Sequence, residues 1–186
     1  MVRLFVAIDL PQDFKEKLSL IPDKVAKPIE SAKWVSSKNV HLTLKFLGYS
    51  PEELIPKIKE RLSKKVKEVE PFTLELRNFG AFPSPKRARV LWLGVENGHD
   101  EVSILQKKVE KALVPLGFEK ENRKFHAHLT LARLRVPQNL QEALSELGAE
   151  KISQAVRVDK VILFQSTLTP KGPIYTALDQ FPLKRR

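Results

Sequence analysis

The chain has 186 residues, enough for one domain with a buried core, and its 42% hydrophobic and 30% charged residues exclude a disordered chain. It has no Cys, which excludes disulfide bonds and thiol chemistry, and no apolar run approaches the roughly 20 residues of a membrane span. Lys and Arg total 33 against 22 Asp and Glu, a net charge of +11 that favours a polyanionic partner, with a solvated lysine-rich surface as the alternative.

Strands and helices are expected to alternate along the chain. In chain order, apolar periodicity and the positions of Pro and Gly predict a strand at 2–8, a helix at 11–25, a strand at 40–47, a helix at about 52–69, strands at 72–82 and 87–95, a helix at 100–113, a strand at 126–135, a helix at 137–147, and strands at 156–164 and 174–178.

Two local patterns add to this outline. The run at 2–8 is too short and strand-like for a signal peptide, so we expect a cytoplasmic protein. Ser50 followed by Pro51 predicts an N-cap and a first-turn proline for the second helix. Period-two alternation in several strands favours antiparallel sheets with one open face, and no segment reads as a flexible linker.

One four-residue string occurs twice, 87 residues apart: His41-Leu42-Thr43-Leu44 and His128-Leu129-Thr130-Leu131. In both copies a helix is expected before the string and another after it. Because side chains alternate along a strand, His and Thr project from one face while the two Leu pack on the other. Two such strands brought together about a pseudo-two-fold axis would place two imidazoles and two hydroxyls around one cleft.

This set of groups suits hydrolysis of a cyclic phosphodiester. The reaction needs a base to take a proton from water and an acid to protonate the leaving alkoxide, and two imidazoles with an ordinary pKa of about 6.5 can share these tasks. Two Thr hydroxyls can donate to the non-bridging phosphate oxygens as charge builds there. The strained ring is already activated, so this chemistry requires neither a metal nor another cofactor.

A single copy is weak evidence. Its ordinary interpretation is a sheet-face His bonded to a neighbour, beside a Thr present for its β-propensity. Two identical copies on similar elements use two of the four His in the chain, and this coincidence favours the catalytic interpretation. The motifs are near-symmetric, so the residues alone do not say which His is the acid.

The chain resembles the two-histidine (2H) phosphoesterases, and within them the RNA 2′,3′-cyclic phosphodiesterases formerly named 2′-5′ RNA ligases. The resemblance covers nearly the whole chain. Ala127 departs from the pattern, because many relatives have Pro before the second motif His. The segments that carry the resemblance are 3–8, 41–48, 89–95, 125–133, 166–168 and 172–175.

The resemblance implies an α+β fold over 1–186, a single domain of two similar lobes, each with an antiparallel sheet, related by a pseudo-two-fold, with helices outside and a central basic cleft. It implies His41 as proton donor and His128 as proton acceptor, with Thr43 and Thr130 binding substrate. RNA 2′,3′-cyclic ends, for example on tRNA fragments, would become 2′-phosphomonoesters, and the reverse reaction would be 2′-5′ ligation. A monomer without a cofactor is expected.

Two cations are further candidates for substrate binding. Lys45 shares strand parity with His41 and Thr43, so we predict a phosphate contact, with a solvated lysine at the strand end as the alternative. Arg133 has the opposite parity to His128, so contact with phosphate requires either a β-bulge between them or the strand ending before Arg133. The family pattern nonetheless ends in this Arg, and we include it as a substrate ligand.

Other side chains near the motifs have more ordinary interpretations. His126 and His128 form a His-x-His pair, but no carboxylate is placed to complete a metal site, so we expect no metal and a rim position for His126. Phe46 and Trp92 lie in apolar strands and are expected in the core. Trp34, beside a polar loop, is the more open candidate for base stacking.

Two other functions remain open. One is a non-catalytic RNA-binding module that uses the basic cleft and predicts RNA binding without turnover. The other is a two-histidine phosphodiesterase for a different 2′-linked substrate, such as 2′,5′-oligonucleotides or small cyclic nucleotides. Product analysis on each substrate separates these alternatives.

Overall fold

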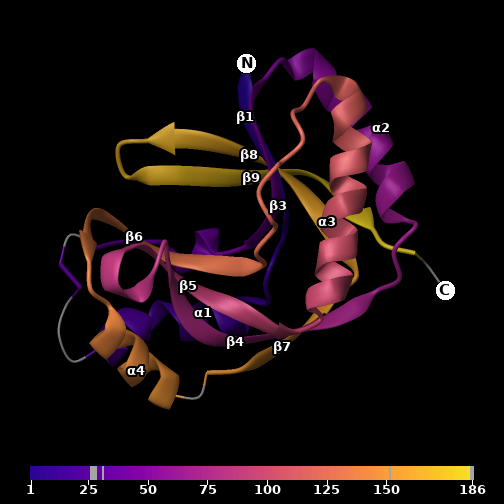
Figure 1. Ribbon diagram of the computed structural model, residues 1–186. Helices are drawn as coiled ribbons and strands as arrows, with labels where there is room; N and C mark the ends of the chain where they lie inside the picture. The colour runs from indigo at the N-terminus through magenta and orange to yellow at the C-terminus, as the bar shows by residue number, and fades with distance from the viewer. Residues whose placement is uncertain (26–28, 31, 151, 185–186) are drawn as a thin grey trace.

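The computed structural model describes residues 1–25, 29–30, 32–150 and 152–184 (Figure 1). Its strands are β1 (Val2–Ile8), β2 (Ala32–Trp34), β3 (Leu42–Ser50), β4 (Phe72–Phe82), β5 (Ala88–Asn97), β6 (His128–Gln138), β7 (Gln154–Val158), β8 (Lys160–Thr169) and β9 (Gly172–Pro182). Its α-helices are α1 (Gln12–Ser19), α2 (Ile55–Val66), α3 (His99–Leu113) and α4 (Gln141–Ala149). Short 3₁₀ turns are η1 (Ile21–Lys24), η2 (Ser37–Asn39), η3 (Glu52–Leu54), η4 (Pro85–Arg87) and η5 (Val114–Leu116).

The strands form one antiparallel sheet with the two motif strands at its centre. The order is β7-β4-β5-β6-β3-β1-β8-β9, and β2 pairs with β6 beside this path. β3 and β6 meet through a single pair, Leu42 opposite Leu129. These residues occupy the same position in the two copies of the motif, so the pseudo-two-fold axis passes between them.

The two halves of the chain repeat one arrangement around this axis. The series β1, α1, β3, α2 corresponds to β5, α3, β6, α4, and in each half the first strand pairs with the motif strand. β4 then pairs with β5, and β8 pairs with β1, so each lobe takes a strand from the other half of the chain. The α+β fold and the two similar lobes are confirmed, and the lobes share one continuous sheet rather than having separate sheets.

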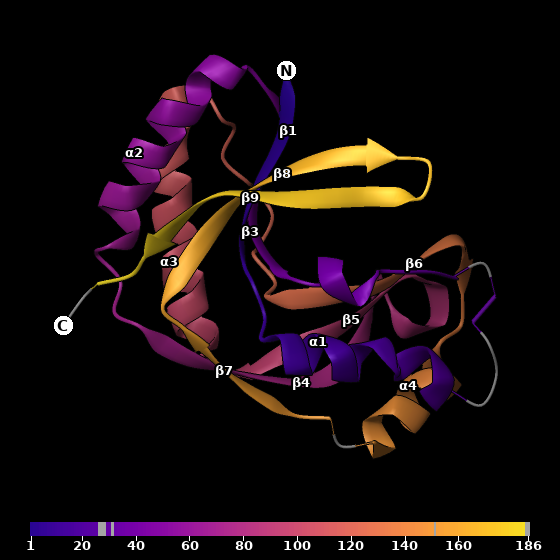
Figure 2. The same cartoon turned by 180° about the vertical axis from the view of Figure 1, so that it is seen from behind.

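The helices cover the outer side of the sheet. α2 and α3 lie side by side on one flank, α1 lies behind β4 and β5 in Figure 1 and in front of them in Figure 2, and α4 lies at the lower end of the molecule near β4. Leu42 and Leu129 are fully buried on this side, as are Ile58 and Leu62 of α2. Burying the Leu positions on the helix side leaves the motif His and Thr on the opposite face. No helix among the described residues is long and apolar enough to cross a bilayer.

The first helix is shorter than the sequence predicts. α1 ends at Ser19, and the chain continues as the 3₁₀ turn η1, which contains Pro22 near its start. A proline has no N–H to donate and its ring clashes with the preceding helical turn, so the α-helix cannot continue through it. Ile21 is still buried, which explains why the apolar spacing suggested a longer helix.

Three other boundaries also differ from expectation. The strand expected at 156–164 is two strands on either side of Asp159, because β7 pairs with β4 and β8 pairs with β1 in the other lobe. Ser50 is the last residue of β3, and its hydroxyl donates to the Leu47 carbonyl instead of capping a helix. The fourth helix begins at Gln141, because β6 extends further than predicted.

Candidate active site

The four motif side chains come together where β3 and β6 meet. His41 immediately precedes β3, and His128 is the first residue of β6. The antiparallel pairing of Leu42 with Leu129 makes the residues one step away on each strand cross-strand neighbours. His41 therefore falls opposite Thr130, and Thr43 falls opposite His128. All four are partly buried, on the face away from the helices.

Both imidazoles are oriented by the backbone in the same way. Nδ1 of His41 lies 2.7 Å from the Asn39 carbonyl oxygen, and Nδ1 of His128 lies 2.6 Å from the His126 carbonyl oxygen. A carbonyl only accepts, so each Nδ1 carries the hydrogen and donates it. In the neutral ring this fixes Nε2 as the unprotonated atom, whose lone pair can accept a hydrogen bond or a proton.

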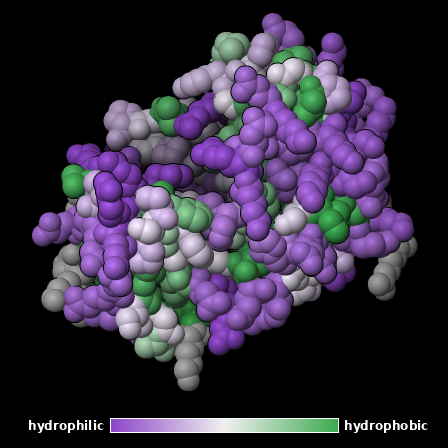
Figure 3. Space-filling model, in the orientation of Figure 1, coloured by the Kyte–Doolittle hydropathy of each residue, from purple (hydrophilic) through white to green (hydrophobic). Residues whose placement is uncertain are grey.

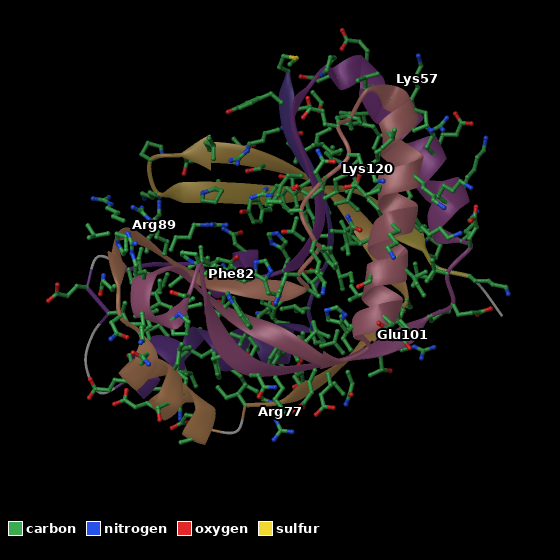
Figure 4. The ribbon with its side chains drawn as sticks, in the orientation of Figure 1. Lys57, Arg77, Phe82, Arg89, Glu101 and Lys120 are labelled. Carbon is green, nitrogen blue, oxygen red and sulfur yellow. The ribbon has the colours of Figure 1, made fainter. Side chains whose placement is uncertain are left out.

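Aromatic rings pack against each imidazole. The His41 ring is stacked on Phe5 with centroids 4.8 Å apart, and the Tyr175 ring meets it edge-on at 5.4 Å. His128 is contacted by Phe82, labelled in Figure 4, at 5.1 Å and by Trp92 at 6.4 Å. These rings limit the motion of the imidazoles and remove part of their hydration.

Burial makes both histidines weaker bases than a free imidazole. It lowers the pKa of His41 to about 4, because the charged ring loses hydration that the Asn39 carbonyl and the charge of Asp9 only partly replace. Burial also lowers the pKa of His128 below its usual 6.5, and the positive charge of Arg133 acts in the same direction. Both rings are therefore neutral in the free protein near pH 7.

The two motifs differ in one contact. Nε2 of His41 and Oγ1 of Thr43 are 2.9 Å apart. Because Nδ1 of the neutral ring is the protonated atom, the Thr43 hydroxyl donates to Nε2 in the free protein. Once Nε2 is protonated the direction of this bond reverses, and the hydroxyl hydrogen is then free to point at a phosphate oxygen.

Lys45 does not lie on the site face, so the parity prediction for this residue was wrong. Thr43 pairs with Ala7 on β1 and Lys45 pairs with Val6, which leaves Leu44 as an extra, bulged residue. Such a bulge turns the following side chain to the other face. Lys45 is 7% exposed, and its Nζ lies 2.8 Å from Glu110 Oε1 and donates to the Glu119 carbonyl at 2.7 Å.

The corresponding bulge in β6 brings Arg133 onto the site face. Thr130 pairs with Trp92 and Ala132 pairs with Leu91, so Leu131 is the extra residue. Arg133 then pairs with Val90, two residues from Trp92 on the same face of β5. The required bulge is therefore present. Arg133 is exposed, and its charge lowers the pKa values of His41 and His128, which places it close to both.

The prediction that Phe46 and Trp92 lie in the core was wrong. Because of the bulge at Leu44, Phe46 instead of Lys45 projects from the site face. Phe46 is 60% exposed, and the centroid of its ring lies 6.0 Å from that of Phe5. Trp92 is partly buried on the same face as Thr130 and lies over Gly80 and Gly94, where any side chain would collide with its ring. Trp34 is partly buried on the other face, because its neighbour Lys33 is the residue paired with Arg133.

His126 lies at the rim of the site. It is exposed and packs edge-on against Phe82, with ring centroids 5.2 Å apart. Within the described ranges, no three His, Cys, Asp or Glu side chains gather in a way that could hold a metal ion.

Sequence reasoning missed the aromatic residues that hold the imidazoles. Phe5, Phe82 and Tyr175 come from β1, β4 and β9, far from the motifs along the chain. A signal was available for two of them, since Phe5 and Tyr175 lie in the segments that carry the family resemblance.

The front face of the molecule is largely hydrophilic and is hollowed between the surface over β8 and β9 and the surface over β5 and β6 (Figure 3). The β8–β9 hairpin projects from the body above this hollow (Figure 1). The side chain of Asn39 ties it to η2 by donating to the Pro173 carbonyl at 2.8 Å. On the face of the sheet that carries the motif His and Thr, Arg133 has a second cation, Lys33, as its cross-strand neighbour.

Comparison with known proteins identifies the family. The model of the 2′-5′ RNA ligase superfamily matches residues 21–169, most of the chain. The chain belongs to this superfamily. Among curated members, it is 37% identical over 185 residues to the RNA 2′,3′-cyclic phosphodiesterase of Methanothermobacter thermautotrophicus, covering 98% of this chain and 99% of that protein. It is 39% identical over 165 residues to the enzyme of the same name from Aeropyrum pernix, covering 87% and 92%.

Solved structures of the superfamily share the fold. A protein from Thermus thermophilus superposes with a TM-score of 0.79 at 29% identity, over 98% of both chains. E. coli LigT complexed with 3′-AMP superposes with a TM-score of 0.78 at 27% identity, over 99% of both chains. The chain therefore shares its overall fold with these two structures.

Proposed function

We propose that this protein hydrolyses RNA ends that carry a 2′,3′-cyclic phosphate, giving 2′-phosphomonoesters. The observation that carries the proposal is the pairing of Leu42 with Leu129, which brings two His and two Thr together on one face beside Arg133. The superfamily membership and the names of the curated relatives support the same reaction. The net charge of +11 suits an RNA substrate.

The proposed reaction is one in-line displacement at phosphorus. Nε2 of His128 takes a proton from water as the water oxygen bonds to phosphorus. The bond from phosphorus to the 3′ oxygen breaks, and Nε2–H of His41 gives its proton to that oxygen. The 2′ ester bond survives, so the product has a 2′-phosphate and a free 3′-hydroxyl. The corresponding displacement with a 5′-hydroxyl in place of water gives 2′-5′ ligation.

The two histidines differ in a way that suits these roles. The pKa of His41 is lowered to about 4, so its protonated form is a strong acid for the leaving oxygen. Binding of the phosphate anion next to His41 favours the protonated ring, and the proton is then held until transfer. His128 is neutral near pH 7 and is therefore ready to accept a proton.

The remaining groups of the site stabilise charge on phosphorus. Thr43 and Thr130 donate to the non-bridging oxygens, and Arg133 adds a positive charge on the same face. Lys45 is excluded from this set, because its charge is paired with Glu110 on the other side of the sheet. The chemistry proposed needs no metal or other cofactor. We further propose a cytoplasmic monomer that acts on RNA fragments, including tRNA fragments.

Replacing one anchoring threonine is expected to slow the reaction strongly. Thr130→Ala removes a donor to the transition state and should reduce kcat by about 10²–10³-fold, the loss known for one oxyanion donor. Thr43→Ala should reduce it by a similar factor. Thr130→Ser keeps the hydroxyl and is the matched control. Single-turnover hydrolysis measures both, and wild-type turnover by Thr43→Ala would refute the anchoring role.

The pH dependence of kcat/KM is expected to be a bell with its maximum below pH 6.5. Activity needs one protonated and one neutral imidazole, and both pKa values lie below 6.5 because both rings are partly desolvated. The singly protonated form is most abundant between the two pKa values and falls about tenfold per pH unit above them. Rates between pH 4 and 9 measure the curve. A maximum at pH 8, or a flat profile, would contradict the assignment.

Substrate comparison tests the proposed function. The protein is incubated with an oligoribonucleotide ending in a 2′,3′-cyclic phosphate, with a 2′,5′-linked oligonucleotide and with 2′,3′-cyclic AMP. We expect the RNA end to be hydrolysed much faster than the 2′,5′-linked oligonucleotide, whose cleavage is the reverse of ligation. Activity on cyclic AMP alone would overturn the assignment to RNA ends. Tight RNA binding with no turnover would favour the binding module.

A further inference from the structure

β3 carries a row of side chains that leads away from the catalytic pair on the site face. Thr43, Phe46 and Tyr49 pair with Ala7, Phe5 and Arg3 on β1, in that order. Arg3, Phe5 and Ala7 alternate on β1 and so share one face. Their partners on β3 share the same face although they are three residues apart, because Leu44 and Leu47 are both bulged.

Gly48 makes the second bulge possible. Its φ of +67° lies in the left-handed region, which side chains with a Cβ adopt only with strain. A Cβ at this position would meet no atom within 4 Å, so the backbone conformation alone accounts for the glycine. Without this turn, Tyr49 would project to the opposite face from Phe46.

The row is exposed and aromatic. Phe46 is 60% exposed and Tyr49 is 63% exposed, so both rings are open to a ligand. A groove of about 490 Å³ runs beside them, between the outer end of β3 and the connection that follows α3. Its lining includes Phe46, Tyr49, Leu54, Leu116, Phe118 and Glu119. Lys120, labelled in Figure 4, follows on the same connection.

A cation lies at the outer end of the row. Arg3 pairs with Tyr49, and its positive charge opposes the burial that raises the pKa of Tyr175. Arg3 is thus near the ring that contacts His41 while also lying beside Tyr49. Aromatic rings that stack bases, with a cation for the backbone phosphate, are the means by which proteins hold single-stranded RNA.

The other motif strand has a different character. The positions on β6 equivalent to Phe46 and Tyr49 are Arg133 and Val136, neither of them aromatic. The pseudo-symmetric fold therefore presents an aromatic arm along β3 and a cationic position along β6. We therefore expect the bases of the substrate to lie along β3. This difference between the two strands would make the substrate bind the near-symmetric site in one orientation.

We propose that the outer part of the β3 arm, the arm being defined as Arg3, Phe46 and Tyr49, binds the penultimate nucleotide of the RNA. Tyr49 stacks on the base before the one that carries the cyclic phosphate, and Arg3 contacts the phosphate that joins the two nucleotides. Phe46 lies between this position and the catalytic pair, beside the terminal base. The inference rests on the proposed function and specifies its substrate as an RNA strand of at least two nucleotides, in preference to a cyclic mononucleotide.

The test compares one long and one short substrate. kcat/KM is measured for an oligoadenylate ending in a 2′,3′-cyclic phosphate and for 2′,3′-cyclic AMP, with the parent and with Tyr49→Ala. Tyr49→Ala removes the ring on which one base stacks, and we expect it to lower kcat/KM for the oligonucleotide roughly 5- to 150-fold more than for cyclic AMP. Phe46→Ala is expected to lower both, because the terminal base is common to the two substrates.

Matched variants separate stacking from folding. Tyr49→Phe keeps the ring and should keep the parent ratio, and Ile104→Ala removes an exposed apolar side chain on α3, away from the arm. An unchanged ratio in Tyr49→Ala, or equal losses on both substrates, would overturn the inference while the proposed function stands.

A second measurement does not depend on turnover. Fluorescence anisotropy of a labelled oligoadenylate with a 2′-phosphate end reports binding even if hydrolysis is absent. Tyr49→Ala is expected to weaken this binding by a similar factor, and unchanged affinity would overturn the inference. A parent protein that hydrolyses neither substrate would refute the proposed function. The effect of Tyr49→Ala on binding would then still show whether the β3 arm binds RNA.

Discussion

His41→Ala and His128→Ala are each expected to reduce hydrolysis of the cyclic end by about 10²–10⁴-fold or more, to the limit of detection. Each ring takes part in the same displacement, one as acid and one as base, so loss of either ring slows the whole reaction. Both rings present Nε2 in the site because a backbone carbonyl holds Nδ1, and no other described side chain is placed to replace them in this way. Single-turnover kinetics with a cyclic-ended oligoribonucleotide measure the loss.

The double variant gives a stronger check on the shared step. If both groups act in one transition state, His41→Ala with His128→Ala is barely slower than either single variant. His99→Ala is the matched control, since His99 is exposed at the start of α3. RNA binding should survive in all of these proteins. Activity within tenfold of the parent in either single variant would contradict paired acid–base catalysis.

The second large effect is expected on stability. Lys45→Met leaves the Glu110 carboxylate buried without its cation, and such a loss costs about 3–5 kcal/mol of the free energy of unfolding. The pair lies between β3 and α3, with side chains 6% and 9% exposed. Lys45 also holds the Glu119 carbonyl, so its loss also frees the connection that leads to the second motif. Urea unfolding measures the change.

Two further variants isolate the buried charge as the cause. Lys45→Met with Glu110→Met removes both charges and is expected to recover most of the lost stability, because an apolar pair of similar volume is often as stable as a buried ion pair. Lys64→Met breaks an exposed pair with Glu60 and should change the free energy of unfolding very little, because solvent screens that pair. A cost for Lys45→Met as small as that for Lys64→Met would show that the buried pair is not important for the fold.

The repeated motif and most of the helices and strands could be predicted from the sequence, because they depend on local patterns. Two identical strings with a helix on either side were enough to expect two strands meeting at an axis. The three-residue strand β2 was missed because it is too short for periodicity to reveal. The α-helix α1 ends before Pro22 because proline cannot continue a helix, and the strand changes its pairing partner at Asp159 because β7 and β8 belong to different lobes. The spacing of apolar residues reports neither effect.

The errors within the site have one cause. Strict alternation places Lys45 with Thr43 and keeps Arg133 away from Thr130, but a bulge at Leu44 and at Leu131 reverses both assignments. The repeat itself indicated this error, because a bulge that brings Arg133 to the site implies the same bulge in the first copy of the motif. A bulge at Leu44 moves Lys45 off the site face and brings Phe46 onto it.

The central claim is tested most directly by the product of one reaction. A short RNA ending in a 2′,3′-cyclic phosphate is incubated with the purified protein in EDTA, and the position of the phosphate in the product is determined. We predict a 2′-phosphate that is absent with His128→Ala. A 3′-phosphate would contradict the assigned leaving group, turnover only after addition of a divalent metal would contradict the metal-free mechanism, and binding without turnover would contradict catalysis itself.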